Sequence, residues 1–203
     1  MSLNHLTTPI EGGNFYHIFS RGINQGDIFF SPNNYAFFIR RLQAYLSPFV
    51  DTLAYSLMPS HFHLLIRANE LITVKNELVD HPIEVGPFIS EAFRKFFIAY
   101  SQAIIKQENL TGNLIDNNFS RVQVNEERLK ALILFIHYNP QEHGVCQDFR
   151  NYDFSSYNTL NSGSKSFIDR ETVYHLFGDS AQFSLEHDSI SGFETIKDLL
   201  IDI

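Results

Sequence analysis

The chain has 203 residues, of which 44% are hydrophobic and 19% are charged. This length excludes two full-sized domains and this composition excludes an intrinsically disordered chain, so we expect one globular domain with a sizeable core. The single cysteine, Cys146, excludes an internal disulfide. The sequence has neither a signal peptide nor an apolar run long enough to cross a bilayer, so we expect a cytoplasmic protein without a membrane partner.

The net charge of −8 at pH 7 is concentrated near the C-terminal end. Residues 166–203 contain eight acidic and two basic side chains, and the rest of the chain is therefore close to neutral. Phosphate contacts need Lys and Arg side chains gathered on one face. The acidity thus argues against a nucleic-acid contact mainly for this last segment.

The first predicted elements are a strand and a helix. Residues 14–21 are β-branched and aromatic residues between glycines, which predicts a strand. Ser31 followed by Pro32 is typical of a helix start, and apolar residues then recur at helical spacing until Pro48.

Two further strands are predicted at 52–58 and 61–67, because both are extended-type apolar runs and only Pro59-Ser60 separates them. A tight antiparallel connection follows from this spacing. The stretch 69–87 mixes apolar, acidic and proline residues, and we interpret it as a short helix plus a loop.

The second half of the chain begins with a long amphipathic helix, predicted from Ser90 to about Glu108. Residues 119–124 predict a fourth strand. A third helix is predicted from Glu126 to about Asn139, with Pro140 at its end.

This order of elements predicts an α+β fold, namely a ferredoxin-like antiparallel sheet with helices packed on one face. We assign residues 1–147 to this domain and residues 148–203 to a mostly helical C-terminal extension. Helical patterns within the extension lie at 170–177 and 192–201.

The residues with the clearest chemistry are His61 and His63, two apart on a predicted strand. Side chains two apart leave the same face of a strand, so both imidazoles can converge on one divalent ion. With nine histidines in the chain, roughly 0.4 such pairs arise by chance, so the alternative is a pair satisfied by ordinary hydrogen bonds.

The context of this pair, Leu57-Met58-Pro59-Ser60-His61-Phe62-His63-Leu64-Leu65-Ile66, resembles the MPNHFHLLI signature of REP-associated tyrosine transposases and related single-strand insertion-sequence transposases of the HUH type. The resemblance covers about residues 14–160 and includes Phe19-Ser20-Arg21-Gly22, the helix 93–107, Thr111-Gly112-Asn113-Leu114 and Ile136-His137-Tyr138-Asn139-Pro140.

The resemblance implies a ferredoxin-like fold, a divalent metal (Mg or Mn) on His61 and His63, single-stranded or hairpin DNA as the partner, and a homodimer. In this family a tyrosine on the last core helix attacks the scissile phosphate and forms a 5′-phosphotyrosine. A cation beside the phosphate makes this chemistry reasonable, because a tyrosine with a pKa of about 10 is a poor nucleophile at neutral pH.

The sequence departs from the family pattern at the nucleophile, where Phe135 stands in place of tyrosine. Asn139 matches the third, polar metal ligand, four residues further on and so on the same helical face. Tyr138 is the candidate for a relocated nucleophile. Tyr100 is a more distant candidate, and its apolar helical neighbours favour core packing. We interpret His137 and His143, near the end of this helix, as partners of the helix C-terminus rather than as further metal ligands.

Several basic residues are candidates for phosphate contacts, with a solvated surface as the alternative. They are Arg21, Arg67, Arg94, Lys95, Lys106 and Arg121. The family often carries a further arginine where this chain has the acidic stretch 115–118.

Three hypotheses follow. The first is an active metal-dependent DNA nicking and strand-transfer enzyme. The second is a catalytically silent homologue that binds hairpin DNA and metal, motivated by Phe135. The third is a metal-free interaction domain, motivated by the net charge.

Overall fold

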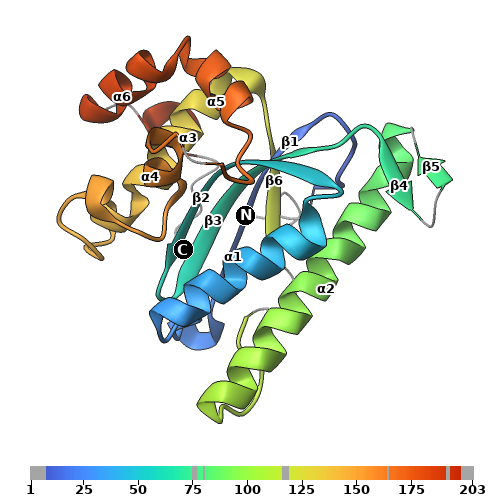
Figure 1. Ribbon diagram of the computed structural model, residues 1–203. Helices are drawn as coiled ribbons and strands as arrows, with labels where there is room; N and C mark the ends of the chain where they lie inside the picture. The colour runs from blue at the N-terminus through green and yellow to red at the C-terminus, as the bar shows by residue number, and fades with distance from the viewer. Residues whose placement is uncertain are drawn as a thin grey trace.

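The computed structural model contains a four-stranded antiparallel sheet with helices on both sides (Figure 1). The structure describes residues 8–74, 77–79, 81–115, 119–163, 165–190 and 193–197. The sheet has the strand order β2-β3-β1-β6, built from β1 (Phe15–Arg21), β2 (Val50–Met58), β3 (His61–Ala68) and β6 (Ser120–Val124). The predicted α+β fold with an antiparallel sheet is confirmed. None of the helices in the described part of the chain is both long and apolar enough to cross a lipid bilayer.

One face of the sheet packs against α1 (Pro32–Leu46) and α2 (Pro82–Glu108), as predicted. The aromatic ring of Phe38 on α1 lies 4.8 Å from that of Phe96 on α2 and 5.2 Å from that of Phe62 on β3. All three side chains are fully buried. This phenylalanine cluster joins both helices to the sheet and accounts for the Phe-rich composition.

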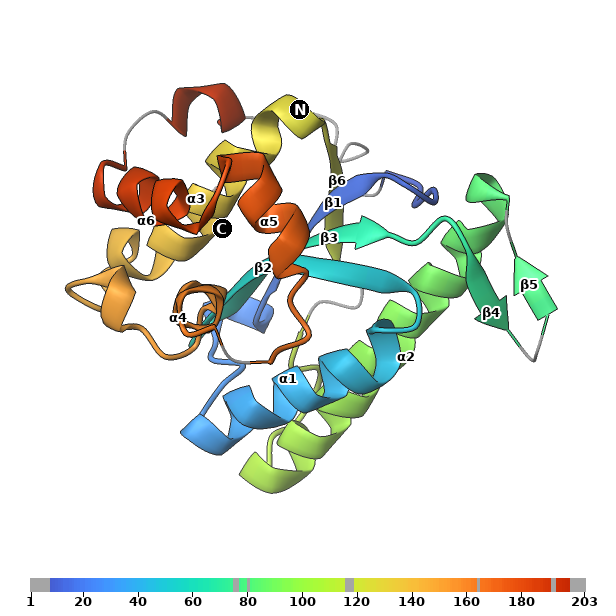
Figure 2. The ribbon, with the colours of Figure 1, turned by 45° about the horizontal axis from the view of Figure 1, so that its top comes forward.

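The opposite face carries a second helical layer, which the prediction of helices on one face did not include. Figure 2 shows α3, α5 and α6 on the side of the sheet away from α1 and α2. The elements of this layer are α3 (Glu126–Glu142), η3 (Phe149–Asn151), α4 (Ser156–Asn161), α5 (Arg170–Phe177), α6 (Ser180–Asp188) and η4 (Phe193–Ile196). Side chains from the extension and from the ferredoxin-like part share one hydrophobic core. The division at residue 147 stays a prediction.

A chain of buried hydrogen bonds ties this second layer together. The Phe183 carbonyl can only accept, so His187 Nδ1 donates to it over 2.7 Å, and His187 Nε2 in turn accepts from His137 Nδ1 over 2.8 Å. Ser156 Oγ lies 2.7 Å from His137 Nε2 and accepts from the Tyr55 backbone N–H. Burial lowers the pKa of both His137 and His187, which favours the neutral form of both imidazoles. The interpretation of His137 as a partner of the helix C-terminus was wrong, because α4 and α6 enclose this side chain.

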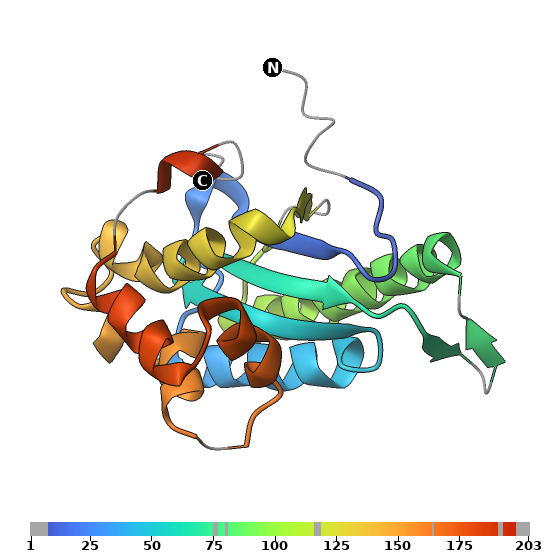
Figure 3. The same ribbon diagram turned by 90° about the horizontal axis from the view of Figure 1, so that it is seen from above.

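The stretch 69–87 does not contain the predicted short helix and loop. It forms a small hairpin of β4 (Ile72–Val74) and β5 (Glu77–Val79), after which α2 begins at Pro82, eight residues before the predicted start. Figure 3 shows the hairpin beside the N-terminal end of α2. Pro82 at the first helical position is compatible with a helix start. Gly86 lets the backbone of residue 10 pack closely against α2, because a Cβ at position 86 would lie 1.8 Å from the Ile10 carbonyl oxygen.

The other boundaries agree with the predictions to within a few residues, apart from the end of the chain. The helix α3 includes Pro140 and continues to Glu142. The helices α4 and α6 were not predicted. Of the pattern predicted at 192–201, the structure describes the short η4, and residues 192 and 198–201 lie outside the described part.

Candidate functional site

The histidine pair lies on the sheet face that α3 covers. Strand pairing places His61 opposite Arg21 of β1, and places His63 between Phe19 of β1 and Ser56 of β2. The two histidine rings are 5.6 Å apart. The prediction that both imidazoles leave the same face follows directly from the strand geometry, since His61 and His63 are separated by one residue.

In the described part of the chain, each of these two histidines makes a hydrogen bond through Nδ1 and none through Nε2. His61 Nδ1 lies 3.1 Å from Ser60 Oγ, and His63 Nδ1 lies 2.8 Å from His17 Nε2. Within the described residues, neither His61 Nε2 nor His63 Nε2 has a hydrogen-bond partner, although both atoms are buried. Buried polar atoms without a partner are rare in folded proteins and call for an explanation such as a bound ion.

Asn139 adds a third buried polar group beside the pair. Its side chain is 1% exposed, and its amide oxygen and nitrogen make no well-formed hydrogen bond in the part of the chain that the structure describes. The amide lies close enough to His61 to raise the pKa of that imidazole. Two imidazole nitrogens and one amide oxygen are a ligand set that divalent metals accept. Across the described ranges, no group of three or more His, Cys, Asp or Glu side chains is arranged to hold a metal, so Asn139 is essential to this set.

Burial keeps both histidines neutral. It lowers the pKa of His61 to about 4, and the neighbouring His143 and Arg21 add to this effect. Burial likewise lowers the pKa of His63 well below its ordinary value, together with His17 and the other nearby imidazoles. A metal-binding imidazole must be deprotonated. The pair is therefore ready to bind a cation at neutral pH without releasing protons.

The α3 aromatic in contact with the pair is Phe135. Its ring meets that of His63 edge to face, with 5.8 Å between ring centroids, and the ring of Phe193 from η4 lies 5.5 Å away on its other side. The ring contacts of Tyr138 are with Phe149 at 6.0 Å and with Phe193 at 5.9 Å, both in the C-terminal extension. The aromatic ring at position 135 thus meets His63 and carries no hydroxyl.

Tyr100 lies in the α1–α2 layer, on the other side of the sheet from the histidine pair. Its hydroxyl donates to the Ile28 carbonyl over 2.7 Å, and its ring meets that of Phe38 at 5.0 Å. Burial raises its pKa further above the ordinary value. Tyr100 is a core residue, as its spacing favoured.

The predicted phosphate contacts fall into two groups, of which the first lies on the histidine face. Arg21 is half-buried beside His61, and its Nε is unpaired within the described ranges. Arg67 lies near the other end of β3 and pairs with Asp51 at 2.7 Å and with Asp169 at 3.6 Å. Arg21 is therefore the cation best placed to contact a ligand at the histidine pair.

The second group lies on α2 and on β6. Arg94 and Lys95 both pair with Glu91, at 2.6 and 3.5 Å, and Lys106 is exposed in the last turn of α2. Arg121 Nε donates to the Thr8 carbonyl, and strand pairing places its side chain on the α2 face of the sheet. The six basic residues do not share one surface.

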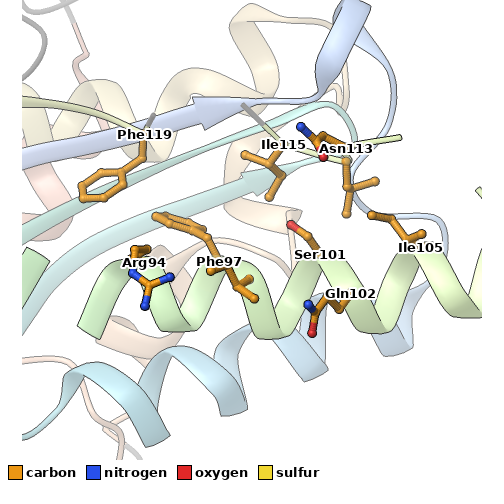
Figure 4. A pocket seen from close by; sticks show the side chains of 10 residues that line it. Arg94, Phe97, Ser101, Gln102, Ile105, Asn113, Ile115 and Phe119 are labelled. Carbon is orange, nitrogen blue, oxygen red and sulfur yellow. The ribbon is translucent and has the colours of Figure 1, made fainter. Parts of the chain in front are cut away.

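A cavity of about 400 Å³ lies between α2 and the loop before β6. Figure 4 shows side chains of α2, among them Phe97 and Ser101, facing Phe119 and Ile115. Its lining is largely apolar, and its one arginine, Arg94, is already paired. Within the described residues, the unpaired buried atoms of His61, His63 and Asn139 lie together on the opposite face of the sheet, so we place the candidate functional site there.

No protein family model matches this sequence, and no curated protein is similar to it. Among solved structures, the fold is similar to that of a REP-associated tyrosine transposase bound to a REP hairpin, with a TM-score of 0.51 and 13% sequence identity. The match covers 79% of this chain and 87% of that one. At this identity the likeness shows a shared α+β fold.

Proposed function

We propose that this chain is a transposase-like protein that binds single-stranded or hairpin DNA, with a divalent metal held by His61, His63 and Asn139. It does not cleave the DNA through a covalent protein–DNA intermediate. The observation that carries the proposal is a set of buried atoms without a hydrogen-bond partner among the described residues, namely His61 Nε2, His63 Nε2 and the Asn139 amide oxygen. The fold it shares with a transposase bound to a REP hairpin supports DNA as the ligand.

The residues fit Mn²⁺ or Mg²⁺ with positions left for oxygen ligands. Two imidazoles favour Mn²⁺, and Mg²⁺ also fits because it keeps several waters and accepts phosphate oxygens. When bound, such an ion supplies positive charge to a phosphate oxygen. Arg21, beside His61, offers its guanidinium to the same phosphate. The chain's own contribution is to hold a phosphate in a fixed place.

The absence of cleavage follows from Phe135. A phenyl ring cannot form a phosphoester, and this ring occupies the α3 position that contacts His63. Tyr138 is three residues further along α3, about 60° away around the helix axis at about 100° per residue. The rings of Phe149 and Phe193 hold it on that side.

An active enzyme with Tyr138 as nucleophile is the second candidate. It is favoured by one observation, namely that Tyr138 is only half-buried and that the rings around it belong to the C-terminal extension. Movement of that extension together with a rotation of α3 would bring its hydroxyl towards the histidine pair.

The test is to incubate the full chain with end-labelled hairpin DNA and Mn²⁺ or Mg²⁺, and to run native and denaturing gels. We expect a metal-dependent complex on the native gel, lost in His61→Ala and kept in the control His175→Ala, whose imidazole is exposed on α5. No covalent band is expected. A covalent band that Tyr138→Phe abolishes would favour the active enzyme, and no complex in any metal would favour a metal-free interaction domain. The homodimer and the cytoplasmic location stay predictions.

A further inference from the structure

His17, which the sequence did not single out, is the direct partner of His63. It lies on β1 with its side chain 1% exposed, and its Nε2 is 2.8 Å from His63 Nδ1. The two rings are stacked, with 5.1 Å between centroids and 19° between planes. Phe19 packs against His17 at 4.8 Å. The His17 ring is therefore held in one place by strand β1 and its neighbours.

The direction of this hydrogen bond is set by the proposed role of His63. A neutral imidazole that presents a bare Nε2 carries its proton on Nδ1. His63 Nδ1 then donates, His17 Nε2 accepts, and His17 keeps its own proton on Nδ1. The opposite direction would place the proton of His63 on Nε2 and block that atom as a ligand.

We infer that His17 is a positioning residue that fixes the tautomer and ring orientation of His63, so that its bare Nε2 points into the candidate metal centre. This inference rests on the proposed function. Partners of this kind hold the second nitrogen of ligating histidines in many metal sites, and their loss typically costs 10- to 100-fold in metal affinity.

His61 has a different kind of partner. Ser60 Oγ, 3.1 Å from His61 Nδ1, is a hydroxyl that can donate or accept, so it does not select one tautomer. The two candidate ligands are therefore positioned differently. The Nδ1 of His63 meets a buried ring that strand β1 and its neighbours hold in place, whereas the Nδ1 of His61 meets a hydroxyl that can rotate.

Two substitutions separate positioning from packing. His17→Phe keeps a ring of similar size and removes the acceptor, whereas His17→Gln supplies an amide oxygen that can accept from His63 Nδ1. In calorimetric titrations of the full chain with Mn²⁺, we expect His17→Phe to weaken binding by about 10- to 100-fold and His17→Gln to restore most of the affinity. The matched control is His187→Gln, which makes the same exchange in the other buried histidine pair, away from this site.

The tautomer itself is measured without metal, by ¹⁵N NMR of the imidazole nitrogens. We expect His63 to be protonated on Nδ1 in the parental chain and to lose this single tautomer in His17→Phe. Nε2 protonation of His63, or equal Mn²⁺ affinity in His17→Phe and the parental chain, would overturn the inference. If the parental chain binds no Mn²⁺ or Mg²⁺, the proposed function fails, and loss of the Nδ1-protonated tautomer of His63 in His17→Phe would still show that His17 controls it.

Discussion

Phe135 and His63 meet edge to face at 5.8 Å, and this contact places a ring without a hydroxyl beside the candidate metal centre. Phe135→Tyr adds a hydroxyl at that position. We predict that this variant gains a covalent protein–DNA band with hairpin DNA and Mn²⁺ on a denaturing gel, because a cation at the histidine pair can stabilise the attacking phenolate. Phe135→Leu is the control without a hydroxyl. A band that already appears in the parental chain would contradict this account of Phe135.

Asn139→Leu is predicted to have opposite effects on metal binding and on metal-free stability. The change removes the amide oxygen, so Mn²⁺ affinity should fall strongly. It also removes buried amide atoms that make no well-formed hydrogen bond within the described residues, so the free energy of unfolding without metal should rise by about 1–3 kcal/mol. Asn139→Asp keeps an oxygen ligand and should bind Mn²⁺ at least as tightly as the parental chain. Loss of stability in Asn139→Leu would show that the amide has a protein partner.

Phe193 covers both Phe135 and Tyr138 from η4, so it restricts access to this side of α3. Phe193→Ala should cost about 1–2 kcal/mol of stability, less than the loss of a fully buried phenylalanine. We predict tighter hairpin binding in this variant on native gels. The control is Leu185→Ala, which removes a 60% exposed side chain from α6. Weaker or equal binding in Phe193→Ala would mean that η4 does not compete with DNA.

The buried pair of His137 and His187 should make the fold sensitive to acid. Burial lowers the pKa of His187 from 6.5 to about 4, and that of His137 well below its ordinary value. Unfolded histidines bind protons below pH 6.5 while the folded ones do not, so stability is complete above that pH and falls as the pH drops from 6.5 towards 4. His187 alone contributes up to about 3 kcal/mol to this loss, at 1.36 kcal/mol per pKa unit.

The measurement is urea unfolding of the metal-free chain at several pH values between 7.5 and 4. His187→Gln should lower stability at pH 7.5 and flatten the decline towards acid, because one group that titrates only on unfolding is gone. A slope as steep as that of the parental chain would show that His187 is protonated in the fold or titrates normally. His61 and His63 also contribute to the loss of stability at low pH. The contribution of His187 is therefore read from the difference between the parental chain and His187→Gln.

The sequence predicted the sheet and its two main helices because each has a clear periodicity. The strand spacing of His61 and His63 and the helical spacing of Phe135 and Asn139 placed these side chains towards the same site. Local patterns of this kind depend only on backbone geometry, so they can be predicted from the sequence without knowledge of the tertiary contacts.

Contacts between distant segments could not be predicted in the same way. The pairing of His17 with His63 depends on which strands are neighbours and in which register, and the chain of His137, Ser156 and His187 depends on how the extension folds back. The start of α2 at Pro82 was missed because two prolines suggested a loop, whereas the first lies where a helix tolerates it.

The central claim is that His61, His63 and Asn139 form a metal centre, and titration of the purified full chain with Mn²⁺ by calorimetry tests it most directly. The account predicts one ion per chain, with binding lost in His61→Ala and His63→Ala and kept in His175→Ala. Absence of binding in the parental chain, or equal binding in the histidine variants, would contradict it.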